Sequence, residues 1–259
     1  MNQKSKLCTI VLVFFVYVSA LIADEFNDIP SLDELKRLHI EGTNGQYALD
    51  KLNSVFASGR ILYYTEDETI ERAFRIYKKK PNKFRSFYET KTAKKIVQLE
   101  VIYDGENAVQ IFSHGGREVY REKLEGEMLE AIKFEAKLEG PFLLVMEENK
   151  QYLAIDGFEL IDGEKCILLR VDGRSQYPYR KIWLSAENFQ EIKSERISEL
   201  NGESRIEEVF YRNYKTIHNI LFASRMDKFV NGKRNFTTFV DSFNVNYGLY
   251  DSLFDIDLN

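Results

Sequence analysis

Hydrophobic and polar residues alternate with a period of two over most of the chain, and this pattern predicts β-strands. Thirteen runs fit it, and Asp-Gly and Asn-Gly pairs that favour hairpin turns separate several of them. The predicted strands are Val55–Thr65, Thr69–Lys79, Lys83–Glu89, Lys95–Tyr103, Ala108–Phe112, Val119–Arg121, Tyr152–Ile161, Glu164–Val171, Tyr179–Ser185, Glu191–Leu200, Glu203–Tyr214, Ile220–Val230 and Arg234–Val245. Because parallel pairing needs long crossovers, which this pattern lacks, it predicts an antiparallel meander.

Helical spacing is confined to two parts of the chain. Near the N-terminus, Ser31-Leu-Asp-Glu34 is a capping-box pattern before a face of Leu32, Leu35 and Leu38, and the spacing resumes at Tyr47–Asn53. In midchain, Glu125–Leu138 predicts an amphipathic helix, which Gly140-Pro141 ends.

The apolar run Phe142–Met146 follows this midchain helix and is expected to be a loop. Helix and loop together are expected to cover one face of the sheet as a lid. The alternative is a helix that only fills the core.

Residues 1–23 have the pattern of a secretory signal peptide. Lys4 and Lys6 precede the uncharged apolar run Leu7–Ile22, and cleavage is expected after Ala20 or Ala23. The alternative is an uncleaved anchor, but the run is shorter than the roughly 20 residues that span a bilayer. Residues 24–259 are then expected to form one exported, periplasmic domain.

Net charge and cysteine content limit the partners and the cysteine chemistry to be expected of this protein. Without the two lysines of the signal, 36 − 2 = 34 basic residues face 41 acidic residues, a net charge of −7. Nucleic acid is therefore not expected as a partner, because its binding proteins present basic surfaces. Cys166 is the only cysteine left and is expected to be a small buried hydrophobe.

No set of residues with catalytic or metal-binding spacing is found. The three histidines, His39, His114 and His218, are far apart in sequence, and His114-Gly-Gly116 is interpreted as a glycine turn. The carboxylates of Asp104 and Glu106 stand beside a turn glycine and are interpreted as solvated turn residues. We therefore expect no metal, no cofactor and no enzyme activity.

Large apolar residues at alternating strand positions are the remaining signal. Any one of them fits an ordinary core, but together they suit a curved sheet that holds an apolar ligand beneath a helical lid. The candidate cavity residues on the strands are Phe74, Ile76, Phe84, Leu99, Val101, Leu169, Ile182, Ile192 and Phe210. The candidate lid residues are Met128, Leu129, Ile132 and Leu144.

From about Gln46 to Phe254 the chain resembles outer-membrane lipoprotein-sorting carriers of the LolA/LolB type. The segments that carry the resemblance are Ala48-Leu-Asp-Lys-Leu-Asn-Ser-Val55, Lys80-Pro-Asn-Lys-Phe-Arg85, Tyr103-Asp-Gly-Glu-Asn-Ala108, Gly140-Pro141, Tyr211-Arg-Asn-Tyr214, Asn231-Gly232 and Asp251-Ser-Leu-Phe254. The resemblance implies a single, mainly β domain: an incompletely closed antiparallel β-barrel (a half-barrel) with an N-terminal helical segment and a midchain lid.

For function, the resemblance implies a non-catalytic carrier that shields acyl chains of lipids or lipoproteins in the periplasm. We expect a monomer whose partners are these acyl chains and, in addition, inner- or outer-membrane transport proteins. An alternative is an envelope sensor or adaptor with a filled core and a protein partner. An enzyme on this fold is the third hypothesis.

Overall fold

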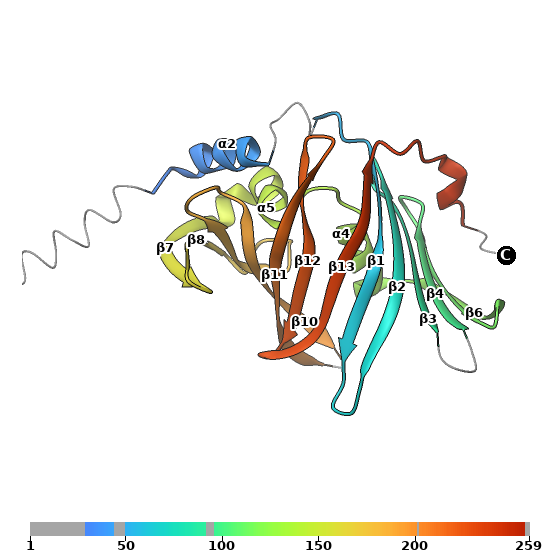
Figure 1. The fold of residues 1–259 in the computed structure, drawn as a ribbon. Helices are drawn as coiled ribbons and strands as arrows, with labels where there is room; N and C mark the ends of the chain where they lie inside the picture. The colour runs from blue at the N-terminus through green and yellow to red at the C-terminus, as the bar shows by residue number, and fades with distance from the viewer. Residues whose placement is uncertain (1–28, 44–49, 92–95, 201, 257–259) are drawn as a thin grey trace, which may run out of the picture.

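The computed structural model describes residues 29–43, 50–91, 96–200 and 202–256. Its centre is one antiparallel sheet of 13 strands, in the order β6-β5-β4-β3-β2-β1-β13-β12-β11-β10-β9-β8-β7 (Figure 1). The strands are β1 Ser54–Tyr64, β2 Thr69–Lys79, β3 Lys83–Lys91, β4 Ile96–Tyr103, β5 Ala108–His114, β6 Arg117–Leu124, β7 Leu153–Ile161, β8 Glu164–Val171, β9 Tyr179–Ser185, β10 Glu191–Leu200, β11 Glu203–Ile217, β12 Ile220–Val230 and β13 Lys233–Val245.

The strand prediction is confirmed in number and order, and β2, β8, β9, β10 and β12 have the predicted bounds. Turn chemistry explains part of this accuracy. Asp162 and Gly163 both have positive φ, as do Asn231 and Gly232, which is the backbone that such pairs favour in a two-residue hairpin. At the Asp104-Gly105 turn, the Asp104 carboxylate accepts hydrogen bonds from the backbone N–H groups of Glu106 and Asn107, both at 2.8 Å. These bonds confirm that Asp104 is a turn residue.

The sheet consists of two meanders, β1–β6 and β7–β13, joined where β1 pairs with β13. A bulge at Ser58/Gly59 interrupts this junction. Gly59 is required there, because an added Cβ would lie 1.9 Å from the carbonyl oxygen of Phe239. Strands β6 and β7 stand at the two edges of the sheet, so the sheet is not closed into a barrel.

In the part of the chain that the structure describes, three α-helices accompany the sheet: α2 Leu32–Gly42, α4 Gly126–Glu135 and α5 Pro141–Asn149. Helices α4 and α5 form the connection between the two sheet edges, and in Figure 1 α4 lies behind the strands. We call the face that these two helices cover the inner face and the opposite face the outer face. The N-terminal helix begins as predicted, with the Ser31 Oγ accepting from the Glu34 N–H at 3.3 Å.

One expectation about the segments outside the sheet is wrong. Phe142–Met146 is not a loop but the buried part of α5, because Pro141 occupies the first turn, where it favours helix. The C-terminal segment Asp251–Phe254 is a 3₁₀ helix, and its Phe254 is buried. The predicted signal peptide and the first three residues of the helical segment Tyr47–Asn53 lie outside the described residues.

Buried side chains form separate clusters on the two faces. On the outer face, Ile161, Cys166 and Trp183 form one cluster, and Cys166 is fully buried as expected. The inner face has three clusters, one at each end and one in the middle, and the difference between them defines the candidate site.

Candidate functional site

The two ends of the inner face are filled by helices. At one end, α5 and α2 pack on β7–β9, and Phe142, Val145, Leu169 and Ile182 are completely or almost completely buried. At the other end, Leu129 and Ile132 of α4 pack against a cluster on β3–β6 that includes Phe84 and Val101. These parts of the inner face are ordinary protein core.

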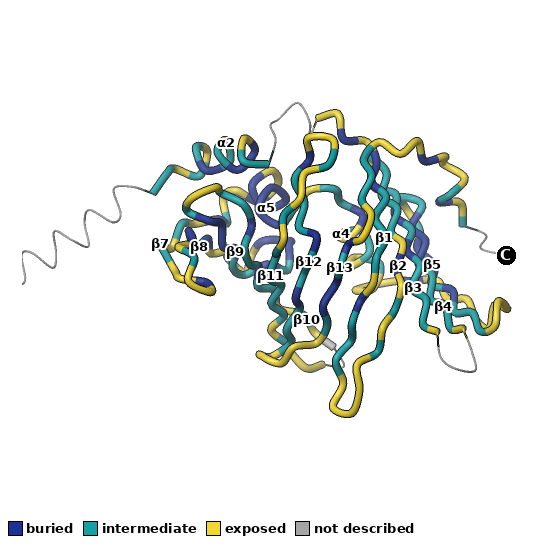
Figure 2. Tube along the Cα trace, viewed as in Figure 1, coloured by how far each residue is buried: buried dark blue, intermediate teal, exposed yellow. Residues whose placement is uncertain are grey.

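The middle of the inner face is covered less completely. Ile61, Phe74 and Val240 are buried there, whereas large apolar neighbours are only partly buried; these are Tyr63, Tyr88, Phe222, Met226, Phe236 and Phe243. We call this set on β1, β2, β3, β12 and β13 the central floor. In Figure 2, α5 is mostly dark blue, whereas the middle strands are largely teal.

The rings of the central floor pack against each other in pairs. Phe222 and Phe243 are stacked with centroids 4.0 Å apart, and Tyr63 and Phe236 lie 5.4 Å apart. Partly exposed aromatic and aliphatic side chains that gather on one surface are typical of a binding site for an apolar ligand.

Most of the predicted cavity residues lie on the inner face. Strand pairing places Phe74 beside Tyr88 and Tyr88 beside Leu99, so these side chains share one face. Ile76 contacts both the central floor and the α4 cluster. Phe84, Val101, Leu169 and Ile182 belong to the filled ends of this face.

The prediction is wrong for Ile192 and Phe210, which lie on the outer face against Trp183. Phe210 pairs with Lys193, whose ammonium stands 5.0 Å from the ring centroid on the outer face. A register shift between Glu191 and Lys193 breaks the alternation that the sequence pattern assumed.

The four predicted lid residues differ in burial. Leu129 and Ile132 are partly buried beneath α4, and Leu144 of α5 is 4% exposed. Met128 is 49% exposed and belongs to none of the inner-face clusters.

Polar side chains follow one border of the central floor. Arg72 stands 4.5 Å from the ring centroid of Tyr63, Tyr63 packs on Phe236, and the Lys228 ammonium lies 5.5 Å from the Phe236 centroid. The Glu207 carboxylate accepts from Lys228 Nζ at 2.8 Å and from Arg196 Nε at 2.6 Å. We call these residues, from Arg72 to Arg196, the cation–ring row.

The cation–ring row lies inside the half-barrel, where the side chains of Lys228 and Glu207 are 14% and 13% exposed. Arg196 Nη1 lies 4.0 Å from the carboxylate of Glu135 on α4, so the row faces the helix. The Glu135 side chain is nevertheless 51% exposed. Burial raises the pKa of the Glu207 carboxyl, but Lys228 and Arg196 outweigh it and lower this pKa to about 2. Glu207 is therefore ionised at neutral pH.

Two polar contacts attach the midchain helices to the sheet. The Glu191 carboxylate on β10 accepts from the Phe142 N–H at 2.7 Å and caps α5, and burial raises the pKa of Glu191 to about 7. Lys78 on β2 donates to the carbonyl of Lys137, just after α4, at 3.0 Å. Burial lowers the pKa of Lys78, and the nearby carboxylates of Glu135 and Glu139 oppose this shift.

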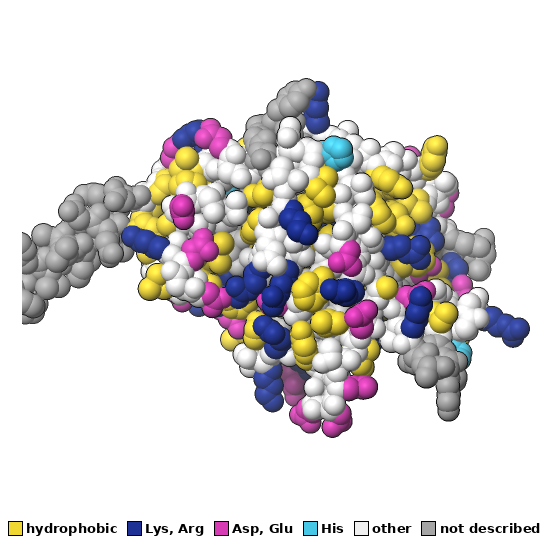
Figure 3. Space-filling view, in the orientation of Figure 1, with side chains coloured by type: hydrophobic (Ala, Val, Ile, Leu, Met, Phe, Trp, Pro, Cys, Tyr) yellow, Lys and Arg dark blue, Asp and Glu magenta, His cyan; other side chains and the backbone are white. Residues whose placement is uncertain are grey.

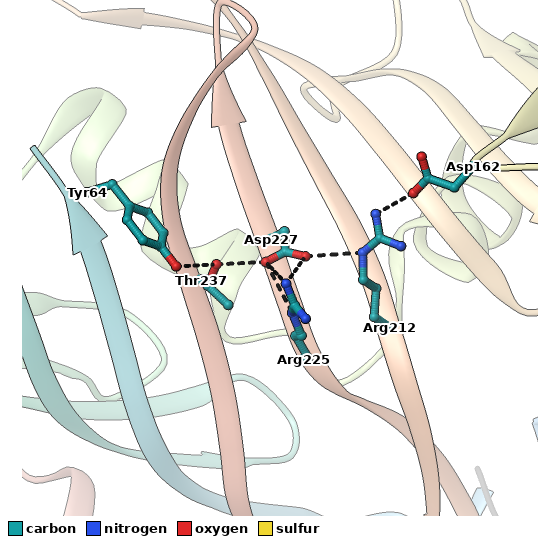
Figure 4. Close-up of polar contacts among 6 residues, drawn as sticks. All are labelled: Tyr64, Asp162, Arg212, Arg225, Asp227 and Thr237. Atoms are coloured by element: carbon teal, nitrogen blue, oxygen red, sulfur yellow. Dashed lines mark hydrogen bonds and ion pairs between the residues drawn. The ribbon is translucent and has the colours of Figure 1, made fainter. Parts of the chain in front are cut away.

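The outer face also has a polar cluster, but its groups are saturated (Figure 4). The Asp227 carboxylate is 1% exposed and accepts from Thr237 Oγ1 at 2.7 Å, from Arg212 Nε at 3.1 Å and from Arg225 Nη2 at 3.1 Å. Arg212 also bonds Asp162 in the β7–β8 turn. This cluster fastens strands together and leaves little free hydrogen-bonding capacity for a ligand.

Figure 3 shows the outer face, where Lys and Arg side chains cross the middle of the sheet among acidic and hydrophobic ones. A shallow groove of about 340 Å³ lies on this face between β1 and β4, lined by Arg75, Phe87, Glu89 and Gln98 among others. Within the described ranges, no three His, Cys, Asp or Glu side chains come together as a metal site. None of the helices in those ranges is long and apolar enough to span a membrane.

The sequence analysis missed Glu191, Arg72, Lys228 and Arg196. Each looks like a surface charge on a strand when the sequence is inspected alone, because cation–ring and ion-pair partners come from other strands. A usable signal was Arg72 within the alternating apolar positions Ile70, Phe74 and Ile76, where an inward charge is unusual.

Comparisons with known proteins identify the fold but find no close relative. No family model matches the sequence, and no curated protein matches it. A DUF1329 family protein from Desulfovibrio piger is 13% identical with a TM-score of 0.55, covering 88% of this chain and 98% of that chain.

Two further solved structures have a similar fold. A putative outer membrane lipoprotein-sorting protein domain from Vibrio parahaemolyticus is 12% identical with a TM-score of 0.54, covering 86% of this chain and 95% of that one. A LolA superfamily protein from Nitrosomonas europaea is 13% identical with a TM-score of 0.52, covering 88% and 99%. The LolA-like open β-barrel fold that the resemblance implied is therefore confirmed, and at this identity the likeness concerns the fold alone.

Proposed function

We propose that this protein is an exported, non-catalytic carrier that binds the acyl chain of a lipid or lipidated protein on the central floor, beneath α4. The observation that carries the proposal is the partly exposed set of large apolar side chains around Ile61, Phe74 and Val240. An ordinary core has no reason to leave such residues accessible under a helix.

Burial of hydrocarbon supplies the binding energy in this proposal. Each methylene moved from water to an apolar surface gives about 0.8 kcal/mol, so a chain of about ten carbons binds without specific polar contacts. The fold supports this role because LolA superfamily structures share it. Export to the periplasm and delivery to a membrane transport partner are part of the same proposal.

Helix α4 is the movable part of the lid. No residue of α4 is fully buried, and its attachment is a patch around Leu129 and Ile132 with the Lys78–Lys137 hydrogen bond at its end. Displacing α4 uncovers the cluster around Phe84 and Val101, but none of the helix's own side chains is fully buried, so opening α4 costs less free energy than opening α5 would.

The test is lipid extraction and mass spectrometry of the purified mature protein, followed by titration with the neutral fluorophore N-phenyl-1-naphthylamine. Met226→Gln puts a polar amide on the central floor and is expected to weaken probe binding about tenfold. Met128→Gln is the matched control, since this side chain is half exposed on α4 and its loss should leave binding unchanged. A protein that yields no lipid and takes up no probe is not a carrier.

The alternative is a sensor or adaptor with a protein partner. It is supported by the filled ends of the inner face, where α5 and α2 pack on a well-buried cluster. In that case both methionine variants bind the probe equally weakly, and the native protein carries no lipid.

A further inference from the structure

We propose that the cargo is an amphiphile with an anionic head group, and that the cation–ring row binds this head group while the central floor binds the tail. The inference rests on the proposed carrier function and adds the chemical class of the ligand. Its central residues are Arg72 and Lys228.

The two surfaces adjoin in the way that an amphiphile requires. Arg72 pairs with Ile61 across β2 and β1, and Ile61 is one of the buried residues of the central floor. Phe236 belongs to both surfaces, because it packs in the central floor and lies under the Lys228 ammonium. A hydrocarbon chain on Ile61 and Val240 therefore ends beside two cations.

The charge of the row is opposite to that of the molecule. The whole chain has a net charge of −5, yet the row contains three cations, Arg72, Lys228 and Arg196, and two carboxylates lie beside them, Glu207 of the row and Glu135 of α4. Placing cations on a partly desolvated inner surface is unfavourable unless they have partners. An acyl chain alone needs no charge, so the excess indicates a ligand that brings a negative one.

Arg72 has hydrogen-bonding capacity to spare. Its Nε is buried and has no hydrogen-bond partner in the described part of the chain, and its guanidinium lies over the Tyr63 ring. A guanidinium presents paired donors that fit a carboxylate or a phosphate. The arginines of the outer cluster differ, because Asp227 and Asp162 already occupy Arg212 and Arg225.

The experiment compares dodecyl phosphate with dodecanol as competitors of N-phenyl-1-naphthylamine on the delipidated mature protein. The two competitors have the same tail, so their difference measures the head group. We expect dodecyl phosphate to bind at least about tenfold more tightly than dodecanol. Inorganic phosphate at the same concentration should not displace the probe.

Variants then locate the head group. Arg72→Gln and Lys228→Gln should each weaken dodecyl phosphate by about tenfold and leave dodecanol unchanged, and Arg72→Lys should keep part of the preference. Arg75→Gln is the matched control: it removes the same charge from the same strand, but from the exposed outer face beside the groove. Thermal unfolding of each variant shows that it is folded.

The outcomes separate this inference from the function on which it rests. Equal binding of the two competitors, or a loss of preference in Arg75→Gln and not in Arg72→Gln, overturns the inference and leaves the carrier in place. Displacement of the probe by inorganic phosphate alone also overturns it, because the tail would then be irrelevant. If neither amphiphile binds, the carrier function itself fails.

Discussion

Helices α4 and α5 are neighbours in sequence and cover the same face of the sheet, but they are held in different ways. Seven residues of α5 are buried, among them Phe142 and Val145 at 0% exposure, whereas α4 has no fully buried residue. Helix α5 is also capped by Glu191 of the sheet and packs against α2, where His39 and Phe142 lie edge to face at 5.1 Å.

The difference shows how one insertion serves two purposes. Because stability follows buried apolar area, α5 opens only when a large part of the protein unfolds, while α4 can open locally. The lid that the sequence predicted is therefore only the α4 half of the insertion in our proposal. The Phe142–Met146 half is a fixed part of the core.

The largest expected effect comes from shortening one large apolar side chain in each of the two helices. Phe142→Ala should lower the free energy of unfolding by about 3–5 kcal/mol, because it opens a cavity in a filled core. Ile132→Ala in α4 should cost about 1 kcal/mol and speed up probe uptake, since Ile132 is only partly buried. Urea denaturation and stopped-flow fluorescence measure the two effects. Equal losses of stability would contradict the comparison.

Because Glu191 caps α5 from the sheet, the free energy of unfolding of the protein should depend on pH. The folded pKa of Glu191 is about 7 against the usual 4.5, so the native state holds a proton that the unfolded state has lost. The stabilisation that comes from this retained proton is complete below about pH 4.5 and is lost as the pH rises to about 7. Between these limits native stability falls, by up to about 3 kcal/mol.

Glu191→Gln isolates this effect, because the amide keeps an acceptor for the Phe142 N–H and cannot ionise. The variant should match the native protein at pH 5 and be more stable than it at pH 8, as measured by thermal unfolding. His39 has a pKa lowered by burial and opposes Glu191 over part of the range, but it is common to both proteins and cancels. A constant difference between the two proteins from pH 5 to 8 would argue against the buried acid.

The smallest effect is expected at the end of α4. Lys78→Met removes the hydrogen bond to Lys137, so the unfolding free energy should change by less than about 1 kcal/mol while probe release becomes several-fold faster. Lys133→Met is the control, because this lysine lies on α4 and pairs only with Glu130 of the same helix. If both variants release the probe at the same rate, Lys78 does not hold α4.

Local patterns carried most of the fold prediction. The strand runs, the Asp-Gly and Asn-Gly turns and the Ser31 cap depend on residues within a few positions of each other, and all were confirmed where the structure describes both residues. The site was harder, because alternation alone does not reveal a bulge. One irregularity at Glu191/Lys193 was enough to assign Ile192 and Phe210 to the wrong face.

By itself the sequence determined that this chain forms an antiparallel meander with an amphipathic insertion and a buried Cys166, since turn preference and hydrophobic period act over short distances. Only the tertiary structure decided that β1 pairs with β13, that α5 belongs to the core, and that Arg72, Lys228 and Arg196 share one inner border. These outcomes depend on contacts between residues more than a hundred positions apart, such as Tyr63 with Phe236. Sheet curvature and packing select such contacts, and no local pattern specifies them.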